Sequence, residues 1–468
     1  MPQASPEPQL LDRTRTAALL QRPLDDILFW RAGQAVAAVT GAIFLRAAAR
    51  VAAELPQAEA YLNLCRDPCG AAIALAACLL RGRPCVLATD HSPSGIAALL
   101  ERFPGAHPML DDHDARCAGF ASATVVDPVA GDDGSTEPFN PQLPLAQVAL
   151  IGLTSGSTGR PVAHAKSWGA LERRSRSAAQ VFHLLHAQRP VVASVSPTHM
   201  YGMETMVLLP LHAATITWCG VSFFPGDAAA NLTAASEMAR REGIAAEPVF
   251  ITTPLHLGAL LVAQTPLPPL HAVISATAPL EAGIAARAEA LWKAPVMEIF
   301  GATEVGSIAS RRTAEDDAWT LYPGITLGLS GGLTEVRAEG APATPLSDVL
   351  ELLSGGRFHL VSRGSDIVKR GGRRASLAGL TRLLAGLEGV QDAAFLMPSL
   401  ARATERPIAF AVAPDRNAAD LLAELRAIID PAFLPRRIIL LERMPRNAMG
   451  KLPRDALLAL LEKPDGRA

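Results

Sequence analysis

The chain of 468 residues lacks the features that mark several large protein classes. No apolar run reaches the roughly 18 to 20 residues of a membrane span, and the best candidate, residues 71–80, lies between Arg66 and Arg81. The formal net charge is only −2 and the basic residues are scattered, which argues against a nucleic-acid partner. The amino terminus carries acids and prolines in place of the basic and apolar stretches of a secretory signal. We therefore expect a cytoplasmic protein without a membrane span.

The six cysteines also lack a metal-binding pattern. Cys65 and Cys69 are separated by three residues, but no second cysteine or histidine pair follows at the spacing of a zinc site. Most of the cysteines lie in apolar stretches of the sequence. We therefore expect ordinary reduced thiols that are buried in the core.

Short runs of β-branched residues alternate with longer alanine- and leucine-rich segments along most of the chain. Residues 191–196, 248–253 and 271–276 have the composition of buried strands, and residues 285–293 have the period of an amphipathic helix. Such alternation predicts an α/β fold with mostly parallel sheets. Residues 132–144, rich in proline and polar residues, are either a linker or a long surface loop.

A break in this pattern near residues 363–365 divides the chain into two predicted domains, residues 1–363 and 364–468. The first is a large N-terminal α/β lobe of parallel or mixed sheets packed with helices. The second has about 100 residues, the usual size of a small domain, and an α+β pattern. Its predicted elements are a helix at 376–387, strands at 390–396 and 408–412, a helix at 418–429 and a strand at 437–441.

Residues 153–161, LTSGSTGRP, form a loop of hydroxyls and glycines after an apolar run that has the composition of a strand. Successive backbone N–H groups in such a turn form a concave nest for anions, and Ser and Thr hydroxyls add donors. The loop fits neither the G-x4-G-K-[ST] pattern of a Walker A motif nor the G-x-S-x-G elbow of hydrolases. Taken alone, it is either a phosphate-binding loop or a flexible surface loop.

Three further motifs follow this loop: FGATE at 300–304, SRGSDIVKRGGRR at 362–374 and MPRNAMGKLPR at 444–454. In this order and spacing, the four motifs resemble those of the adenylate-forming superfamily of acyl- and aryl-CoA synthetases, luciferases and peptide-synthetase adenylation domains. The resemblance covers roughly residues 50–468. It implies that a carboxylic acid is activated with ATP and Mg²⁺ as an acyl-adenylate, that a thiol then attacks, and that the small domain moves on a hinge.

In the superfamily, the hydroxyl loop wraps the β- and γ-phosphates of ATP. The resemblance assigns this role to Thr154, Ser155, Gly156, Ser157, Thr158 and Gly159. A lysine usually follows the proline of the loop, whereas Val162 stands at that position here. Lys166 lies four residues further along and is the candidate for supplying the missing charge.

Within FGATE, the resemblance places Phe300 and Gly301 at the nucleotide, with the Phe300 ring against the adenine face. Thr303 is expected to hydrogen-bond the α-phosphate. Glu304 is expected to ligate Mg²⁺, a hard cation that prefers carboxylate and phosphate oxygens. A solvated side chain at a strand end is the alternative interpretation of Glu304.

The resemblance also implies a ribose site and a hinge. Asp348 is the candidate for the ribose, because a carboxylate accepts two hydrogen bonds from a vicinal diol, and Arg363 would reach the ribose or a phosphate. Ser347 replaces the glycine that usually precedes this aspartate. Gly364 and Ser365 occupy the hinge, where the superfamily usually has Asp or Lys in place of the serine. A basic surface turn is the alternative for this segment.

The small domain carries the remaining implied groups. Gly371, Gly372 and Arg374 would face the active site in the thioester-forming state. Lys451 would reach between the substrate carboxylate and the α-phosphate and neutralise both as the bond forms. An ammonium on a long, flexible stem suits a catalytic group that enters and leaves with a moving domain.

The segment SPTHMYGME, residues 196–204, resembles the part of the superfamily that lies beside the acyl substrate. His199 is the expected gate, with a core histidine bonded to the backbone as the alternative. The expected pocket walls are Tyr201, Gly202, Met203, Ser275, Ala276, Thr277, Ala278, Gly301, Ala302 and Ile308. These walls are small and mostly neutral, which points to an apolar or aromatic carboxylic acid.

Together these residues predict an ATP-dependent carboxylic acid ligase that forms a thioester on CoA or on the phosphopantetheine of an acyl carrier protein. The short chain and the loop without its lysine also resemble the carrier-loading ligases of aryl-polyene and xanthomonadin-type pigment clusters. A nucleotide-binding regulatory protein built on a decayed ligase is the alternative, because Val162, Ser347 and Ser365 depart from the pattern. A kinase or hydrolase is disfavoured, since the P-loop lysine and the nucleophile elbow are both missing.

Overall fold

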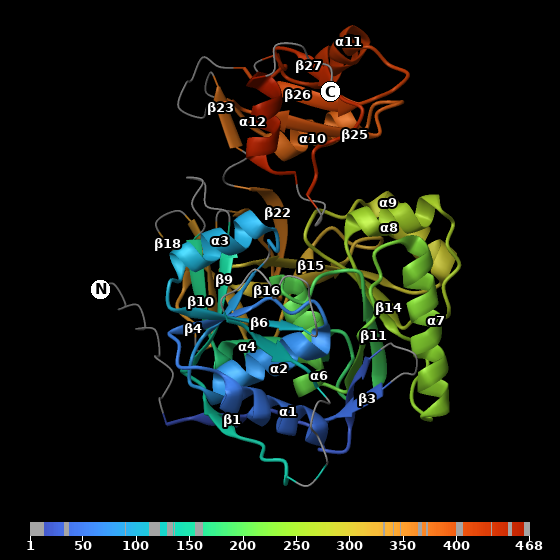
Figure 1. The fold of residues 1–468 in the computed structure, drawn as a ribbon. Helices are drawn as coiled ribbons and strands as arrows, with labels where there is room; N and C mark the ends of the chain where they lie inside the picture. The colour runs from blue at the N-terminus through green and yellow to red at the C-terminus, as the bar shows by residue number, and fades with distance from the viewer. Residues whose placement is uncertain are drawn as a thin grey trace. The chain divides into compact units, whose positions relative to one another are not determined.

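The computed structural model describes residues 14–31, 37–88, 90–111, 122–128, 134, 136–154, 162–330, 333–339, 341–346, 348–363, 367–370, 373–398, 406–431, 433–447 and 452–462 (Figure 1). The chain forms two compact units: Met1–Leu327 with Val336–Thr344, and Gly328–Glu335 with Pro345–Ala468. The division passes through β18 (Ile325–Ser330), β19 (Leu333–Ala338) and β20 (Thr344–Pro345). The sequence-based boundary between residues 363 and 364 stays a prediction.

The first unit contains a six-stranded sheet in the order β10-β9-β5-β4-β6-β7. The strands are β4 (Ala60–Asn63), β5 (Cys85–Leu87), β6 (Ala106–Asp111), β7 (Thr124–Val126), β9 (Val148–Thr154) and β10 (Val162–Ser167). All neighbours are parallel except β9 and β10. A separate antiparallel pair joins β1 (Thr16–Ala18) to β8 (Gln142–Pro144).

Helix α1 (Gly41–Glu54) precedes the first strand of this sheet in the chain, and α2 (Pro68–Leu80) and α3 (Pro93–Arg102) lie between its strands. Every residue of α2 from Pro68 to Leu79 is buried, so the apolar run at residues 71–80 is a core helix. Across the described residues, no helix combines the length and the apolar character that a bilayer crossing requires.

A second sheet of the first unit runs in the order β17-β16-β15-β14-β13-β11-β12-β2-β3. Its strands are β2 (Ile27–Arg31), β3 (Ala37–Thr40), β11 (Arg189–Ala193), β12 (Thr215–Trp218), β13 (Val249–Thr252), β14 (Ala272–Ser275), β15 (Val296–Ala302), β16 (Gly306–Arg312) and β17 (Trp319–Leu321). From β2 to β15 all neighbours are parallel, and the strands predicted within 191–196, 248–253 and 271–276 are among them. Their carboxyl ends therefore meet at one edge of the sheet.

Helices pack around this second sheet. Helices α7 (Pro225–Arg241), α8 (Pro254–Val262) and α9 (Ala282–Trp292) lie beside β11 and β14 in Figure 1 and share one apolar core with the sheet. Another core contains α1, α2, α5 (Met200–Gly202) and the π-helix η2 (Met203–Leu208), which continues into α6 (Leu209–His212). Helix α4 (Trp168–Val181) contacts β9 and β10 of the first sheet and β16 of the second. One helix thus packs against both sheets.

After its share of β18, β19 and β20, the second unit has an antiparallel hairpin of β21 (Asp348–Leu352) and β22 (Arg357–Arg363). A second hairpin consists of β23 (Ile367–Arg370) and β24 (Arg373–Ser376). Next come α10 (Leu377–Ala385), β25 (Asp392–Leu396), β26 (Ile408–Val412), α11 (Ala418–Ile428), β27 (Ile438–Leu440) and α12 (Arg454–Glu462). Strand β26 pairs antiparallel with β25 and parallel with β27, and α10 and α11 share a core with these strands. The predicted fold class, a large α/β lobe plus a small α+β unit, is confirmed.

Within the described residues, Cys65, Cys69, Cys78 and Cys85 are buried free thiols and Cys219 is a half-buried one. Burial raises the pKa of Cys65, Cys69, Cys78 and Cys219 well above the ordinary thiol value. These thiols therefore stay protonated and unreactive at neutral pH. The sixth cysteine, Cys117, lies outside the described residues.

His212, at the end of α6, is a buried histidine whose ring lies 5.3 Å from that of Trp168. Neither ring nitrogen makes a hydrogen bond to a described residue. Burial lowers the pKa of His212 from 6.5 to about 3. Below pH 6.5 the His212 imidazole therefore binds a proton in the unfolded chain but not in the folded chain. The free energy of unfolding thus falls as the pH falls towards 3.

We expect the His212→Phe variant to be less sensitive to acid than the wild type. Between pH 7 and pH 5 the wild type should lose about 2 kcal/mol more of its free energy of unfolding, because one pKa unit corresponds to about 1.4 kcal/mol. Urea unfolding of both proteins at the two pH values measures the difference. Equal losses in the two proteins would show that His212 is not the group responsible.

Candidate active site

The site residues predicted in the first unit follow the carboxyl ends of neighbouring parallel strands. Ser275 ends β14, Phe300 lies near the end of β15, and the segment with His199 follows β11. The Tyr201 hydroxyl donates a 2.8 Å hydrogen bond to the backbone oxygen of Ile274 in β14. This bond ties the segment after β11 to the strand that carries Ser275, so the two predicted parts of the acyl pocket are joined in the structure.

The FGATE motif spans the end of β15 and the turn that follows it. A β-bulge directly after Phe300 shifts the register between β15 and β16, which stay paired up to Ala302 and Gly306. The Val305 amide then donates a 3.0 Å hydrogen bond to the Ala302 oxygen. Thr303 and Glu304 are the two residues enclosed by this bond, and both are half-buried. The turn thus places a hydroxyl and a carboxylate next to each other at the end of the strand.

Strand β9 brings the start of the hydroxyl loop to this turn. A side chain on Gly152 of β9 would begin 3.1 Å from Cγ2 of Thr303. Strand β9 ends at Thr154, directly before the loop. Residues 155–159 themselves lie outside the described residues. The strand that leads into the hydroxyl loop and the FGATE motif, which are far apart in the sequence, therefore meet where β9 passes Thr303.

A buried carboxylate supports the other end of the turn. Glu204 of η2 is 5% exposed and accepts a 3.2 Å hydrogen bond from the Ser307 amide and another from the Ser307 hydroxyl. Gly306, which directly precedes Ser307, has φ 94°, and a Cβ atom there would lie 2.4 Å from Oε1 of Glu204. Only glycine satisfies both this φ angle and this contact. Like many π-helical turns, η2 lies at a candidate functional site.

Phe300 is held by a second buried carboxylate through two intervening side chains. Its ring centroid lies 5.4 Å from that of Trp319, and the Arg311 guanidinium lies 4.4 Å from the Trp319 ring. Arg311 in turn forms a 2.8 Å ion pair with Glu298, which is 3% exposed. This chain of contacts fixes the position of the ring that is expected to stack on adenine.

The acyl-pocket residues divide into covered and accessible groups. Met203 and Ile308 are completely buried, as is Ser275, and Tyr201 and Ala276 are nearly so. Gly202 is packed tightly, since a Cβ atom there would lie 2.0 Å from the Ser196 oxygen. Thr277, Ala278 and Ala302 are half-buried, and Gly301 is exposed. The accessible part of the expected wall is therefore made of these last four residues.

Two residues of this region, His199 and Thr277, have a local geometry that bears on their roles. His199 is half-buried, and its Nδ1 accepts a 3.3 Å hydrogen bond from the Tyr201 amide at the start of α5. Its role as a gate stays a prediction, because a backbone-bonded histidine was the alternative. Thr277 has φ 81°, which is rare for a β-branched residue and is often found at functional sites.

In the second unit, the structure brings together the two residues predicted to bind the ribose. Asp348 of β21 and Arg363 of β22 are directly opposite each other in the hairpin register. Arg374 lies in β24. The predicted residues Gly364, Ser365, Gly371, Gly372 and Lys451 lie outside the described residues, as does Ser347. Their roles stay predictions.

Comparison with known proteins identifies the family. Residues 27–337 match the family model described as AMP-binding enzyme. The chain belongs to the AMP-binding enzyme family. The predicted membership of the adenylate-forming superfamily is thereby confirmed.

Relatives of this AMP-binding enzyme are distant. A 4-coumarate–CoA ligase from Rhodobacter capsulatus is 30% identical over 282 residues, 58% of this chain and 66% of that protein, just under two thirds of its length. ATP-bound MatB from Rhodopseudomonas palustris has a TM-score of 0.76 at 19% identity, covering 94% of this chain and 96% of that one. MenE from Bacillus subtilis in complex with AMP has a TM-score of 0.74 at 17% identity, covering 95% and 96%. Both structures show the same fold.

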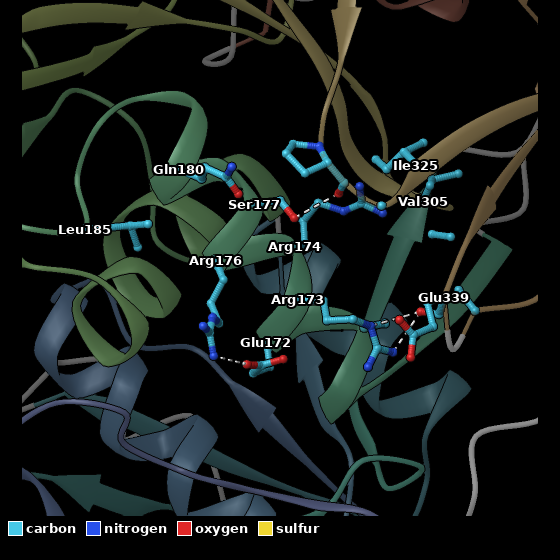
Figure 2. A pocket seen from close by; sticks show the side chains of 15 residues that line it. Glu172, Arg173, Arg174, Arg176, Ser177, Gln180, Leu185, Val305, Ile325 and Glu339 are labelled. Atoms are coloured by element: carbon cyan, nitrogen blue, oxygen red, sulfur yellow. Dashed lines mark hydrogen bonds and ion pairs between the residues drawn. The ribbon is translucent and has the colours of Figure 1, made fainter. Parts of the chain in front are cut away.

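A cavity of about 320 Å³ lies beside α4, and Val305, which follows the FGATE motif, is one of the residues that line it (Figure 2). Two of its three arginines are already engaged: Arg173 donates to the Glu339 backbone oxygen at 2.7 Å, and Arg176 pairs with Glu172 at 3.5 Å. None of the predicted site residues lines this cavity. We assign it no ligand in the AMP-binding enzyme.

Sequence reasoning assigned no role to four residues that support the site: Glu204, Ser307, Arg311 and Trp319. Glu204 offered a signal, because it is the only acid in the apolar run 200–211, and an acid in such a run is usually buried and paired. The other three offered none, since their importance comes from contacts between distant segments.

We expect Gly152→Val to impair this AMP-binding enzyme by displacing Thr303. Overpacking at such a contact costs about 1–3 kcal/mol, so kcat/KM for ATP should fall by about tenfold or more. Gly283→Val is the control, because no atom lies within 4 Å of a Cβ built there. ATP–pyrophosphate exchange measures both variants. An unchanged kcat/KM in Gly152→Val would show that β9 does not position the turn.

Proposed function

We propose that the protein is an ATP-dependent carboxylic acid ligase that forms an acyl- or aryl-adenylate, releases pyrophosphate and transfers the acyl group to a thiol. The observation that supports this most is the meeting of β9 with the Thr303–Glu304 turn. The strand that leads into the expected phosphate loop is thereby next to a carboxylate with a neighbouring hydroxyl, and in-line attack on a polyphosphate requires such groups close together. Membership of the AMP-binding family supports the same chemistry.

The residues at the turn fit Mg²⁺. Glu304 offers a carboxylate and Thr303 a hydroxyl, both hard oxygen donors next to the expected phosphate loop. When bound, the ion supplies charge neutralisation on the phosphates. Of the chain's own groups, Thr303 would hold the α-phosphate, residues 154–159 would donate N–H groups to the β- and γ-phosphates, and Phe300 with Gly301 would bind the adenine.

The second unit would complete the reaction. Asp348 and Arg363, paired across one hairpin, would hold the ribose and orient the α-phosphate. Lys451 would neutralise the substrate carboxylate and the α-phosphate during adenylation. Rotation at Gly364 and Ser365 would then bring Gly371, Gly372 and Arg374 to the site for attack by the thiol, with the boundary between the two working domains at residues 363 and 364.

The acid is proposed to be apolar or aromatic, because the accessible wall formed by residues 277, 278, 301 and 302 carries no charge. His199 would lie at its entrance, beside Tyr201, Gly202 and Met203. The name of the relative, 4-coumarate–CoA ligase, agrees with an aryl substrate and a CoA acceptor. The acceptor is CoA or a carrier-protein phosphopantetheine, and the reaction is assigned to the cytoplasm.

Pyrophosphate release with a panel of benzoates, cinnamates and fatty acids tests the reaction, with CoA and a holo-carrier protein compared as acceptors. We expect release with at least one aryl or apolar acid and thioester formation on one acceptor. Binding of ATP without turnover by any acid would instead favour a nucleotide-binding regulatory protein, the alternative raised by Val162, Ser347 and Ser365.

Lys451→Ala should separate the two half-reactions. We expect adenylate formation to fall by about 10²-fold or more, because the cation acts only while charge develops at the α-phosphate. Thioester formation from a preformed, purified adenylate should stay within about twofold of the wild type, since no such charge then forms. Single-turnover assays of each step make the comparison. An equal loss in both steps would mean that Lys451 does not have this role.

A further inference from the structure

A cluster of buried charges lies beneath the turn that carries Glu304. Its members are Lys166 of β10, Arg174 of α4 and Glu204 of η2, which are 6%, 8% and 5% exposed. Burying charged groups costs several kcal/mol per ion unless partners compensate. The three side chains come from three elements of the first unit, and Glu204 and Arg174 both lie within 4 Å of a Cβ atom built on Gly306.

The cluster contains more positive than negative charge. Glu204 is its only acid, and two of its acceptor positions are already taken by Ser307. Arg174 lies on the same side, since its Nε is 3.8 Å from a Cβ atom built on Gly306, and that Nε makes no hydrogen bond to a described residue. One carboxylate therefore faces two cations. A second carboxylate nearby would neutralise the remaining positive charge of the cluster.

The register of β10 shows where Lys166 lies relative to the turn. Side chains alternate along a strand, so Val162, His164 and Lys166 share one face. His164 is directly opposite Gly152, whose open side faces Thr303. Residues opposite each other in an antiparallel pair share a face, so Lys166 is on the face that meets the FGATE turn.

The same register shows that Lys166 does not take the place of the lysine that the superfamily usually has at the position of Val162. Lys166 is four residues from Val162, or about 13 Å along the strand, and it is buried whereas Val162 is exposed. The Lys166 ammonium therefore sits under the turn and does not extend from the loop. Its charged neighbours are Glu204, Glu304 and Arg174.

We propose that Lys166 is a positioning residue for Glu304: its ammonium, anchored by Glu204, holds the Glu304 carboxylate in place for the metal–nucleotide complex. The inference rests on the proposed function. It gives the buried lysine of β10 a role other than that of the lysine that usually follows the loop proline. Burial lowers the pKa of Lys166 to about 8, with Glu204 and Glu304 opposing the effect, so the ammonium form predominates at neutral pH.

Binding of ATP with and without magnesium tests this role apart from activity. Titration calorimetry compares the wild type, Lys166→Met and Lys166→Arg with ATP in excess Mg²⁺ and with ATP in EDTA. We expect Lys166→Met to weaken binding of MgATP by about tenfold or more and to leave binding of metal-free ATP within about twofold. Lys166→Arg, which keeps the charge, should recover most of the MgATP affinity.

Two further variants connect the effect to its neighbours. Glu304→Gln should weaken MgATP binding, and adding Lys166→Met to it should cause little further loss, because both changes remove one interaction. If Lys166→Met fails to fold with Glu204 left uncompensated, Lys166→Met with Glu204→Gln removes both charges, and the same selective loss of MgATP affinity is expected.

The outcomes separate this inference from the proposed function. Unchanged MgATP affinity in Lys166→Met, an equal loss with and without magnesium, or additive losses in the double variant would each overturn the positioning role while the ligase proposal stands. A wild-type chain that does not bind MgATP would overturn both. A lower melting temperature with unaltered MgATP affinity would reduce Lys166 to a structural residue and also overturn the inference.

Discussion

The turn after β15, which carries Thr303 and Glu304, depends on one buried carboxylate. Glu204 accepts both the amide and the hydroxyl of Ser307 and lies so close to Gly306 that no side chain fits there. A buried carboxylate without partners is costly, so these contacts fix the start of β16 and, through it, the turn that carries Glu304. The acid is supplied by a π-helix whose sequence is otherwise apolar, which places the charge inside the core and not at the surface.

The two sheets explain how distant motifs come to one place. Helix α4 packs against β9 and β10 on one sheet and β16 on the other, so the phosphate-loop strand and the FGATE turn have a common support. Gly152 allows β9 to approach Thr303 closely. On the other side, the Phe300 ring contacts Trp319, and Arg311 lies over Trp319 while it pairs with Glu298. The part of the expected nucleotide site that lies in the first unit is thus built on packed elements.

Much of this was predictable from local sequence, and the rest was not. The parallel strands at 191–196, 248–253 and 271–276 follow from runs of β-branched residues, and the helices and strands of the second unit follow from their apolar periods. Glu204 and Ser307 are 103 residues apart, and no local pattern relates them. Nor does the sequence show that Lys166 is buried, since a polar strand residue next to a loop is usually exposed. Such contacts arise from tertiary packing alone.

Glu304, held over the Glu204 cluster, is expected to meet the metal–triphosphate complex at the end of β9. A crystal structure with Mg²⁺ and a non-hydrolysable ATP analogue tests it most directly. The account predicts a Glu304 oxygen about 2.1 Å from the ion and the triphosphate against residues 154–159. A triphosphate bound elsewhere, with Glu304 away from the metal, would contradict it.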